Sequence, residues 1–329
     1  MRLVVLGGAG YIGSHFAKCA EVNGYEVVVF DNLSTGHIWA SLGFKCVFAD
    51  IRDRSSLSAE LKPSDIVCHF AAKSIASESV VNPALYEDNN VLGTRMVLEA
   101  MMDVGCTKII FSSTAAVYSP PKYGDSLSEN SPIGPINPYG VSKLKAESLI
   151  RAWFEETAGQ AVVFRYFNAC GAWPAHKLGE AHVPETHLIP NVINAILNKR
   201  NRFFLYGNKH PTLDGSCVRD YVHVCDLAEA HLLGVENMLN QHAPSYQTFN
   251  LGTGSGHSNL QVIAECERQM GLKLDYQLLP NRLGDPATLV SSSELAKKTL
   301  GWCPKKSELS RIIRDAITWH QDILPERLR

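Results

Sequence analysis

A tyrosine and a lysine four residues apart, Tyr139 and Lys143 in NPYGVSK, carry the clearest chemical signal in the sequence. If the stretch opens a helix, positions four apart lie on one face and can point at one ligand. A phenol with an ordinary pKa of ~10 must become more acidic by about 3 units, or ~4 kcal/mol, to act as a base near neutral pH. An ammonium at roughly 5 Å supplies about 3 kcal/mol at an effective dielectric of ~20. The pair therefore predicts a tyrosine base assisted by a lysine and a second cation, and the alternative is a polar pair on a solvated helix face.

A hydroxyl group is expected beside this base. The run KIIFSSTAAVY predicts a buried strand that ends near Thr114, which lies 25 residues before Tyr139. Side chains at the carboxyl ends of parallel strands project into the crevice where ligands bind. Thr114 could there hydrogen-bond the oxygen that is deprotonated. Ser112 and Ser113 satisfy the same spacing, and any of the three hydroxyls could instead cap a loop.

Three glycines, Gly7, Gly10 and Gly13, form a G-x-x-G-x-x-G pattern between the first apolar run and the first expected helix. Such glycines let the backbone turn tightly and approach a pyrophosphate, whose charge then lies at the helix N-terminus. The next apolar run ends at Asp31, 18 residues after Gly13, where a carboxylate can accept hydrogen bonds from both ribose hydroxyls. That carboxylate would repel a 2′-phosphate, and NLSTGH contains no Arg or Lys to compensate. The pattern predicts NAD rather than NADP.

Short runs rich in Val, Ile and Phe must position these groups. Their nearly continuous hydrophobicity predicts strands buried on both faces. The segments between them predict helices, one from Tyr11 to Asn23 before Gly24 and one that follows Pro83 and stops at Gly105. Strands that alternate with crossover helices predict an α/β protein with a doubly wound parallel sheet. The runs are RLVVLG, YEVVVFD, KCVFAD, DIVCHFAA, KIIFSS and AVVFRYFN.

Two domains are expected. The sheet should occupy residues 1–168, and a smaller substrate-binding α+β domain should occupy residues 169–329. After Asn168 the sequence becomes rich in Pro, Gly and His and loses the regular alternation, as in GAWPAHKLGEAHVPETHLIP. Within residues 218–252, VRDYVHVCDLAEAH and TFNLGTG predict elements that return to the first domain.

Composition excludes several classes of function. The 329 residues carry 31 basic and 33 acidic side chains without long blocks, which does not fit a nucleic-acid or membrane surface. No run approaches the ~18 apolar residues of a membrane span. Nine scattered cysteines without a CxxC motif indicate reduced thiols, so a cytoplasmic protein is expected. His182 and His187 are five apart, which does not fit two ligands on one helical face; they are interpreted as ordinary histidines, and no metal site is predicted.

Seven segments together resemble the UDP-glucose (UDP-galactose) 4-epimerases of the extended short-chain dehydrogenase/reductase family. The resemblance runs in register over nearly the whole chain and implies a Rossmann-type first domain, a UDP-sugar substrate and a homodimer. It also implies Thr114, Tyr139 and Lys143 as the catalytic group. The segments are GGAGYIGSH, DNLSTGH, FSSTAAVY, NPYGVSK, RYFNACGA, GEAHVPETHLIP and VRDYVHVCDLAEAH.

The expected NAD contacts combine the glycine turn, the strand ends and the resemblance. Asp50 and Ile51 lie at the end of the third apolar run and are expected near the adenine. The alternative is that they only end the strand and have no role in binding. The resemblance places Asn90 near the cofactor, and Tyr166 beside the nicotinamide. A cofactor lysine of some members aligns with Ser74 rather than Lys73, which is left unassigned. The full expected set is Gly7, Gly10, Tyr11, Ile12, Gly13, Asp31, Asn32, Asp50, Ile51, Phe70, Ala71, Asn90, Ser112, Tyr139, Lys143 and Tyr166.

The substrate side rests mainly on the resemblance. Arg219 and Arg282 match diphosphate residues, and a guanidinium can give a phosphate two hydrogen bonds at once. Tyr206 matches an aromatic side chain against which uracil can lie. His187 stands where other members have Asn. The expected substrate contacts are Thr114, Asn168, His187, Leu188, Tyr206, Arg219, Arg282, Asp285 and Leu289.

The reaction that the resemblance implies is 4-epimerization of a UDP-hexose through a transient 4-keto sugar, with NAD retained. Leu289 stands where a bulky Tyr is associated with plain hexoses, so UDP-GlcNAc and UDP-GalNAc are a further expected pair. Trp173 stands where smaller residues are usual, which leaves a pentose or uronate open. Ala115 and Ala116 replace the acid pair of dehydratases. A non-catalytic nucleotide sensor is the alternative class, but such proteins tend to lose the Tyr or the Lys.

Overall fold

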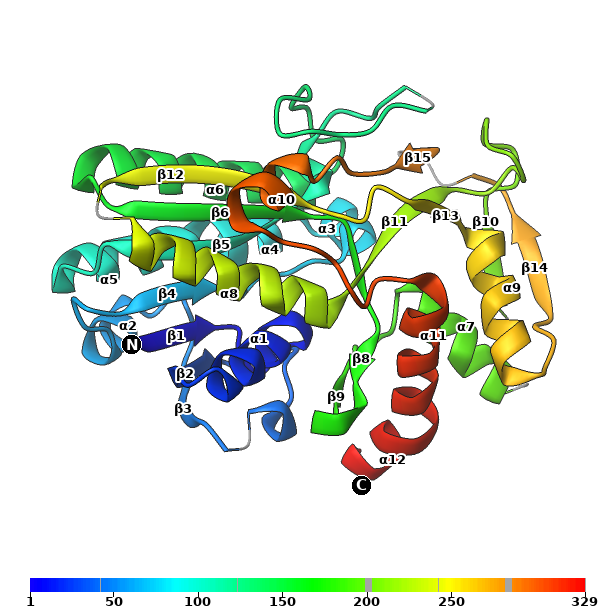
Figure 1. Cartoon of the computed structure of the whole chain (residues 1–329), viewed down its shortest axis with the longest axis horizontal. Coiled ribbons are helices and arrows are strands. Elements are labelled where there is room, and N and C mark those ends of the chain that lie inside the picture. The colour runs from blue at the N-terminus through cyan, green and yellow to red at the C-terminus, as the bar shows by residue number, and fades with distance from the viewer. Residues whose placement is uncertain (42, 123, 199–202, 242, 282–285, 329) are drawn as a thin grey trace.

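A central sheet of seven parallel strands organises the protein (Figure 1). The computed structural model describes all residues except 42, 123, 199–202, 242, 282–285 and 329. In the sheet, Val4 pairs with Val28 on one side and with Val67 on the other, and all three side chains are buried. In spatial order the strands are β12 (Ser245–Leu251), β6 (Gln160–Tyr166), β5 (Lys108–Thr114), β4 (Ile66–His69), β1 (Arg2–Leu6), β2 (Glu26–Asp31) and β3 (Lys45–Phe48).

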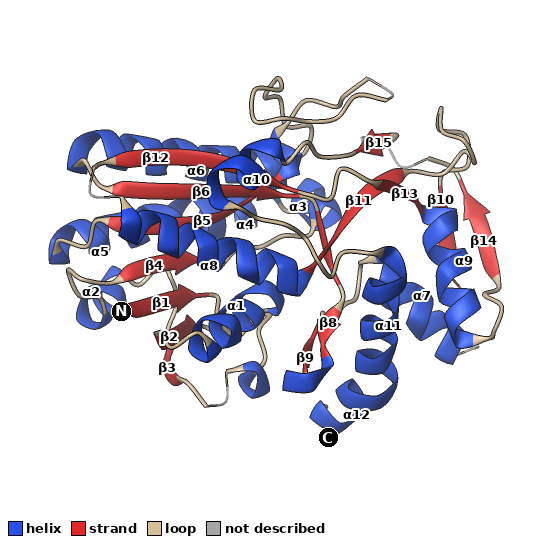
Figure 2. Cartoon of the chain, in the orientation of Figure 1, coloured by secondary structure: helices blue, strands red, loops and turns tan. Residues whose placement is uncertain are grey.

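Helices cover both faces of this sheet (Figure 2). On one face, Phe16 of α1 and Leu227 of α8 share a core with Val5 and Phe164 of the strands. On the other face, helices α2, α5 and α6 close a second core. The predicted doubly wound sheet is therefore confirmed. The covering helices are α1 (Tyr11–Val22), α8 (Val224–Asn240) and α10 (Glu294–Leu300), and opposite them α2 (Arg54–Glu60), α5 (Gly93–Val104) and α6 (Pro138–Thr157).

The segment expected to return from the second half of the chain divides between two places. Strand β12 pairs along its length with β6 and forms one edge of the central sheet. Helix α8 packs beside α1 over that sheet. The strand just before α8, β11 (Val218–His223), instead pairs with short strands outside it, which are β7 (Asn168–Cys170), β13 (Gly256–Ser258) and β15 (Thr288–Leu289).

The remaining elements surround a third apolar cluster that includes Ile193, Ile263 and Ile312. In Figure 1 they lie to the right of the central sheet. Among the described residues, no helix is both long and apolar enough to cross a bilayer. The elements of this part are β8 (Ala172–Trp173), η4 (Pro174–His176), β9 (Leu178–Gly179), α7 (Leu188–Leu197), β10 (Phe203–Tyr206), α9 (Asn259–Met270), β14 (Tyr276–Leu279), α11 (Leu309–Thr318), η5 (Trp319–Ile323) and α12 (Leu324–Arg327).

The predicted helix after Pro83 is interrupted. It comprises α4 (Pro83–Tyr86), a π-helical segment η2 (Glu87–Leu92) and α5, which ends at the left-handed Gly105. Wide turns of this kind are often found at functional sites because they displace side chains from the regular spiral. Here the wide turn carries Asn89 and Asn90. The remaining short helices are η1 (Ile38–Ala40), α3 (Ala76–Val81) and η3 (Ala115–Val117).

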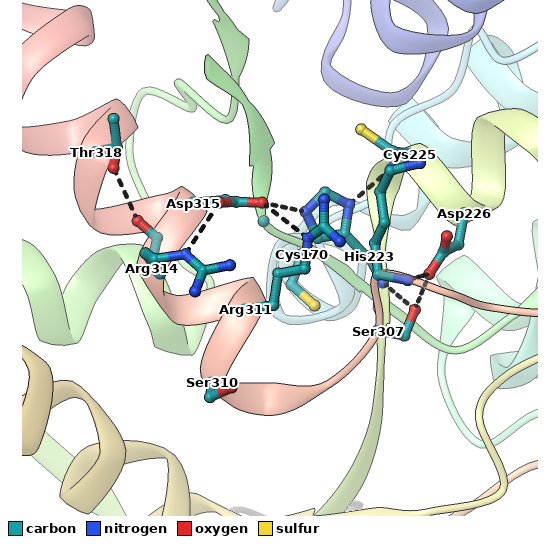
Figure 3. Close-up of polar contacts among 12 residues, drawn as sticks. Cys170, His223, Cys225, Asp226, Ser307, Ser310, Arg311, Arg314, Asp315 and Thr318 are labelled. Carbon is teal, nitrogen blue, oxygen red and sulfur yellow. Dashed lines mark hydrogen bonds and ion pairs between the residues drawn. The ribbon is translucent and has the colours of Figure 1, made fainter. Parts of the chain in front are cut away.

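A buried polar network joins α11 to the start of α8 (Figure 3). The His223 side chain accepts a hydrogen bond from the Cys225 backbone at 3.0 Å and faces the Asp315 carboxylate at 3.3 Å. Its backbone N–H donates to Ser307, whose hydroxyl donates to Asp226. Because buried polar groups must be paired, the network fixes α11 against the sheet-covering helix.

Candidate active site

A cavity of about 470 Å³ opens at the carboxyl ends of the central strands. Ligands bind at this edge of open parallel sheets, where neighbouring crossovers diverge. The cavity is bounded on its other side by the segment from residue 167 to 190 and by β11. It is lined by most of the predicted site residues: Gly7, Gly10, Tyr11, Ile12, Gly13, Asp31, Asn32, Ile51, Phe70, Ala71, Ser112, Thr114, Tyr139, Lys143, Tyr166, Asn168, His187, Leu188 and Arg219.

The glycine turn has the shape expected of a pyrophosphate cradle. Gly7 has a φ of +78°, and a Cβ on it would lie 2.6 Å from the Ala71 nitrogen. A Cβ on Gly13 would lie 2.2 Å from the Gly7 oxygen, whereas one on Gly10 would meet only that same oxygen, at 3.3 Å. Gly7 and Gly13 thus pack the helix onto the strand, and Gly10 leaves the backbone open toward the cavity. Helix α1 begins at Tyr11 without an acidic residue in its first turn, so its N–H groups favour an anion.

Asp31 is positioned at the end of β2 by the same turn. One carboxylate oxygen accepts the Ala9 N–H at 2.9 Å, and the other accepts the Leu33 N–H at 2.8 Å. Burial raises the pKa of the carboxyl group, and the two backbone donors lower it. The group lines the cavity with a free acceptor position on each oxygen, as ribose hydroxyls require.

The local fold of α6 explains how Tyr139 reaches the cavity. Asn137 caps the helix, because its side chain accepts the Gly140 N–H at 2.9 Å, and Pro138 follows at the first position. A Cβ on Gly140 would lie 2.3 Å from the Ala116 oxygen, so the helix starts in close contact with the turn after β5. This contact brings Tyr139 beside Thr114, which the small residues of that turn permit.

The electrostatics of the pair differ from the expectation in one respect. Burial raises the pKa of Tyr139, and Thr114 lowers it. Burial also lowers the pKa of Lys143 to about 7, against the charge of Glu147. The Lys143 ammonium lies 4.1 Å from the centre of the Phe111 ring, which stabilises its charged form. The sequence predicts that the Lys143 charge lowers the pKa of Tyr139. In the protein alone, desolvation outweighs that lowering, because both side chains are buried in the same cavity wall.

A pH dependence of stability follows for the nucleotide-free protein. Unfolded lysine has a pKa of ~10.4, so between about pH 7 and that value the unfolded state binds more protons at Lys143 than the folded state. The contribution of this group to stability must rise with pH across that window, by at most about 1.4 kcal/mol per unit. The melting temperatures of the parent protein and of Lys143→Met should therefore approach each other as the pH rises. A constant difference from pH 7 to pH 10 would contradict the lowered pKa.

Two predicted cofactor contacts, Asp50 and Asn90, are engaged by neighbouring groups of the protein. Among the described residues, neither Asp50 nor Asn90 lines the cavity. The Asp50 carboxylate is held by Arg52 and Asn32, which lower its pKa below the usual range although burial opposes them. The Asn90 side chain accepts the Lys73 N–H at 2.8 Å and donates to the Lys73 oxygen at 3.0 Å. Asn90 therefore holds in place the segment that contains Lys73, and Lys73 lines the cavity.

The substrate side is partly assembled. Asn168, His187, Leu188 and Arg219 line the cavity, and one Arg219 nitrogen donates to the Val218 and Pro286 carbonyls. Within the described part of the chain, Tyr206, Leu289 and Trp173 lie outside the cavity lining. Leu289 of β15 pairs with Arg219 of the neighbouring strand β11. Arg282 and Asp285 lie outside the described residues.

The comparisons with known proteins agree with this geometry. Residues 3–252 match the NAD dependent epimerase/dehydratase family. The chain belongs to this family. A UDP-glucose 4-epimerase of Halalkalibacterium halodurans is 43% identical over 98% of the chain and 96% of that protein, and one of Lacticaseibacillus casei is 43% identical over 98% and 97%.

Solved structures show the same likeness. The UDP-glucose 4-epimerase of Brucella ovis in complex with NAD is 40% identical, with a TM-score of 0.91 over 96% of this chain and 97% of that one. The Bifidobacterium longum enzyme in complex with NAD+ and UDP is 33% identical, with a TM-score of 0.90 over 97% and 98%. The resemblance read from the sequence is thus confirmed at the level of the epimerase/dehydratase family.

Two features of this epimerase/dehydratase site escaped the sequence analysis. The first is an ion pair behind Lys143, in which Glu147 binds Arg165 of β6, both side chains being buried. Its signal was an acidic residue one turn after Lys143, but such spacing is common on helices. The second is the loop 180–187, where the two histidines interpreted as ordinary lie beside Glu180.

That loop holds its charges in a buried setting. The Glu180 carboxylate is 4% exposed, and its pKa lies below the usual range because the histidine charges outweigh burial. Burial alone would lower the pKa of His182, but Glu180 and Glu185 raise it to about 10. The pKa of His187 is raised by the Glu180 charge. The helical-spacing argument did not apply because the segment is a loop up to α7.

Proposed function

We propose that the protein interconverts the C4 epimers of a UDP-hexose, UDP-glucose and UDP-galactose, through a transient 4-keto sugar. One observation carries this proposal: a single cavity joins the dinucleotide turn at Gly10, the carboxylate of Asp31 and the Thr114, Tyr139 and Lys143 side chains. The relatives named UDP-glucose 4-epimerase support the substrate class.

The residues present fit NAD as the cofactor. The open backbone at Gly10 and the start of α1 suit a pyrophosphate, and Asp31 suits unmodified ribose hydroxyls. When bound, NAD+ would supply a hydride acceptor for C4 of the sugar and then the matching hydride donor, so that the net redox change would be zero. The cofactor is therefore expected to stay bound through turnover.

The protein's own contribution is proton transfer and positioning. The Tyr139 phenolate takes the proton from the sugar O4–H and later returns it, while Thr114 orients the same oxygen. Because burial raises the pKa of Tyr139 in the protein alone, the base needs positive charge at the moment of reaction. Lys143 supplies one charge, and its pKa of about 7 makes the charged form available near neutral pH.

The test is a substrate panel with purified protein and no added NAD. UDP-galactose, UDP-GalNAc, UDP-arabinose and UDP-glucuronate are incubated separately, and the products are separated by chromatography. Conversion of UDP-galactose to UDP-glucose is the expected result, and the nucleotide released on denaturation should be NAD. Turnover of only the pentose or uronate would assign a different sugar. Bound NAD without any turnover would favour a nucleotide sensor.

Substitution of Leu289 tests the proposed acceptance of N-acetylated sugars. Leu289 is adjacent to Arg219 in the β11–β15 pair, and it is half-buried against the turn that follows β5. A larger side chain at this position would therefore crowd the substrate side. Leu289→Tyr should reduce kcat/KM for UDP-GalNAc about tenfold or more and leave that for UDP-galactose within about threefold, as steric discrimination predicts. Steady-state kinetics measure both. Equal losses on the two substrates would remove this role.

We also propose a homodimer formed through the helices on one face of the first domain. Exposed apolar side chains occur on α3, η2, α5 and α6, namely Val80, Val81, Leu92, Met102 and Val141. Light scattering coupled to size exclusion should give twice the mass of the 36.2 kDa chain. Met102→Glu should shift that mass toward the monomer, because a charge would be buried in the interface. A monomeric parent protein would contradict the proposal.

A cytoplasmic location is proposed on the state of the thiols. None of the nine cysteines, which all lie in the described part of the chain, forms a disulfide, and six of them are buried. Free thiols in this number suit a reducing compartment.

A further inference from the structure

Four potential metal ligands converge in the loop between β9 and α7. Glu180, His182, Glu185 and His187 each offer one ligand atom, and these atoms all lie within 4.8 Å of one another. The residues come from a span of eight positions, and His187 forms the N-cap of α7. The cluster lies at the part of the cavity wall near Tyr11, whose ring centre is 6.3 Å from that of His182.

Hydrogen bonding within the cluster leaves one nitrogen unmatched. Both His182 Nδ1 and His187 Nδ1 approach the same oxygen of Glu180, the former at 2.9 Å. The His187 nitrogen makes a hydrogen bond there, whereas the His182 contact is an ion pair without one. His182 Nδ1 is nevertheless shielded from solvent and has no other hydrogen-bond partner among the described residues. Two imidazole nitrogens thus converge on one buried carboxylate oxygen, and the His182 nitrogen is held there by an ion pair without an aligned hydrogen bond.

The surrounding structure holds these ligands in place. The Glu180 backbone oxygen accepts the Trp319 ring N–H, and a Cβ on the preceding Gly179 would lie 2.3 Å from the Trp319 ring. One oxygen of Glu185 accepts the backbone N–H groups of Thr186 and His187, at 2.8 and 2.9 Å. These bonds fix the main chain of the loop and also hold the Glu185 side chain in place. Positioning of this kind is what a metal site requires of its supporting groups.

We propose that Glu180, His182, Glu185 and His187 bind one divalent transition-metal ion, with Zn²⁺ as the first candidate. Two imidazole nitrogens and two carboxylate oxygens match the ligand preference of Zn²⁺, whose bonds of about 2.0–2.2 Å place tetrahedral ligands roughly 3.4 Å apart. The ligand atoms lie within 4.8 Å of one another, so the most distant of them must come closer by about 1.4 Å at most. One divalent ion also balances the charge of the two carboxylates.

The position of the site defines its role. The ion would connect the end of the β8–β9 hairpin to the start of α7, and so fix the wall segment that carries His187 and Leu188. This is a structural role, which requires no open coordination position. The proposal is independent of the proposed reaction, because metal binding is measured without turnover.

The experiment titrates Zn²⁺ into the full-length protein after dialysis against a chelator, with calorimetry as the readout. One Zn²⁺ per chain is expected, with a rise in melting temperature and, for Co²⁺, visible d–d absorption. Glu180→Gln and His182→Gln should each weaken Zn²⁺ binding about 100-fold or more, since even outer-shell changes cost 10–100-fold. His176→Gln, in the preceding β8–β9 hairpin and outside the cluster, is the matched control and should bind like the parent.

The outcomes separate the alternatives. Tyr139→Phe should bind Zn²⁺ like the parent even though it is expected to lack turnover. Thermal melts of the chelator-treated variants show whether each one is folded before its affinity is compared. Absence of a 1:1 binding event in the parent, or equal binding by parent, Glu180→Gln and His182→Gln, would overturn the proposal and leave the cluster as a set of ion pairs.

Discussion

Replacement of Tyr139 by Phe should abolish epimerization while the protein remains folded and retains its nucleotide. The substitution removes one oxygen from a ring that lines the cavity next to Thr114. Loss of a general base typically costs 10²- to 10⁴-fold in rate, and the neighbouring phenol of Tyr166, which also lines the cavity, is bonded to Ser112 rather than to Thr114. We expect a fall in kcat of about 10³-fold or more, measured by conversion of UDP-galactose with a sensitive product assay.

Tyr86→Phe is the matched control for this prediction. The Tyr86 ring packs against Tyr139 at 6.3 Å, and its hydroxyl donates to the Ile75 oxygen and to Glu78 outside the cavity. Its removal should lower stability by about 1 kcal/mol, the net value of a hydrogen bond, with kcat nearly unchanged. A Tyr139→Phe enzyme with more than about a tenth of parental kcat would remove Tyr139 as the base.

Replacement of Glu147 by Gln should be among the most destabilising single changes behind the active site. The Glu147 carboxylate binds the Arg165 guanidinium through two nitrogens, at 3.0 and 2.5 Å, and accepts the Ser113 hydroxyl. Glu147 is 4% exposed and Arg165 is 8% exposed. Removing one partner of a buried pair leaves an uncompensated charge, at a cost of about 3–5 kcal/mol. The difference should appear in the midpoint of denaturant unfolding.

The same helix supplies the control. Lys145 and Glu87 form an ion pair at 2.8 Å in which both side chains are more than half exposed. Water screens such a pair, so Glu87→Gln should change stability by less than about 1 kcal/mol. Glu147→Gln/Arg165→Met should recover part of the loss, because the stranded charge is gone. If Glu147→Gln and Glu87→Gln were equally mild, the buried pair would not have the assigned role.

Glu147 also links stability to catalysis. Its charge raises the pKa of Lys143, which burial lowers. Glu147→Gln should therefore reduce the charged fraction of Lys143 at neutral pH and shift the basic limb of the kcat profile to lower pH. A purely structural role for Glu147 would leave that limb in place.

Much of the first half of the fold could be predicted from the sequence. Strands buried on both faces require continuous apolar runs, and glycine is needed where φ is positive, as at Gly7 and Gly105. The Tyr139 and Lys143 spacing, the glycine turn and Asp31 likewise follow from local rules of backbone geometry. These residues lie on regular elements, and the cavity contains each of them.

Contacts and pKa values that depend on segments distant in the sequence were decided by the tertiary structure alone. Helical spacing separated His182 from His187, yet the loop turns both toward Glu180. Asn90 and Asp50 matched expected positions, but their side chains are occupied by Lys73 and Arg52. The pKa of Tyr139 depends on its burial. Burial cannot be predicted from the local sequence, because all the segments around the side chain together exclude water. Local sequence thus determined which groups face the sheet edge, and packing determined their charge and their partners.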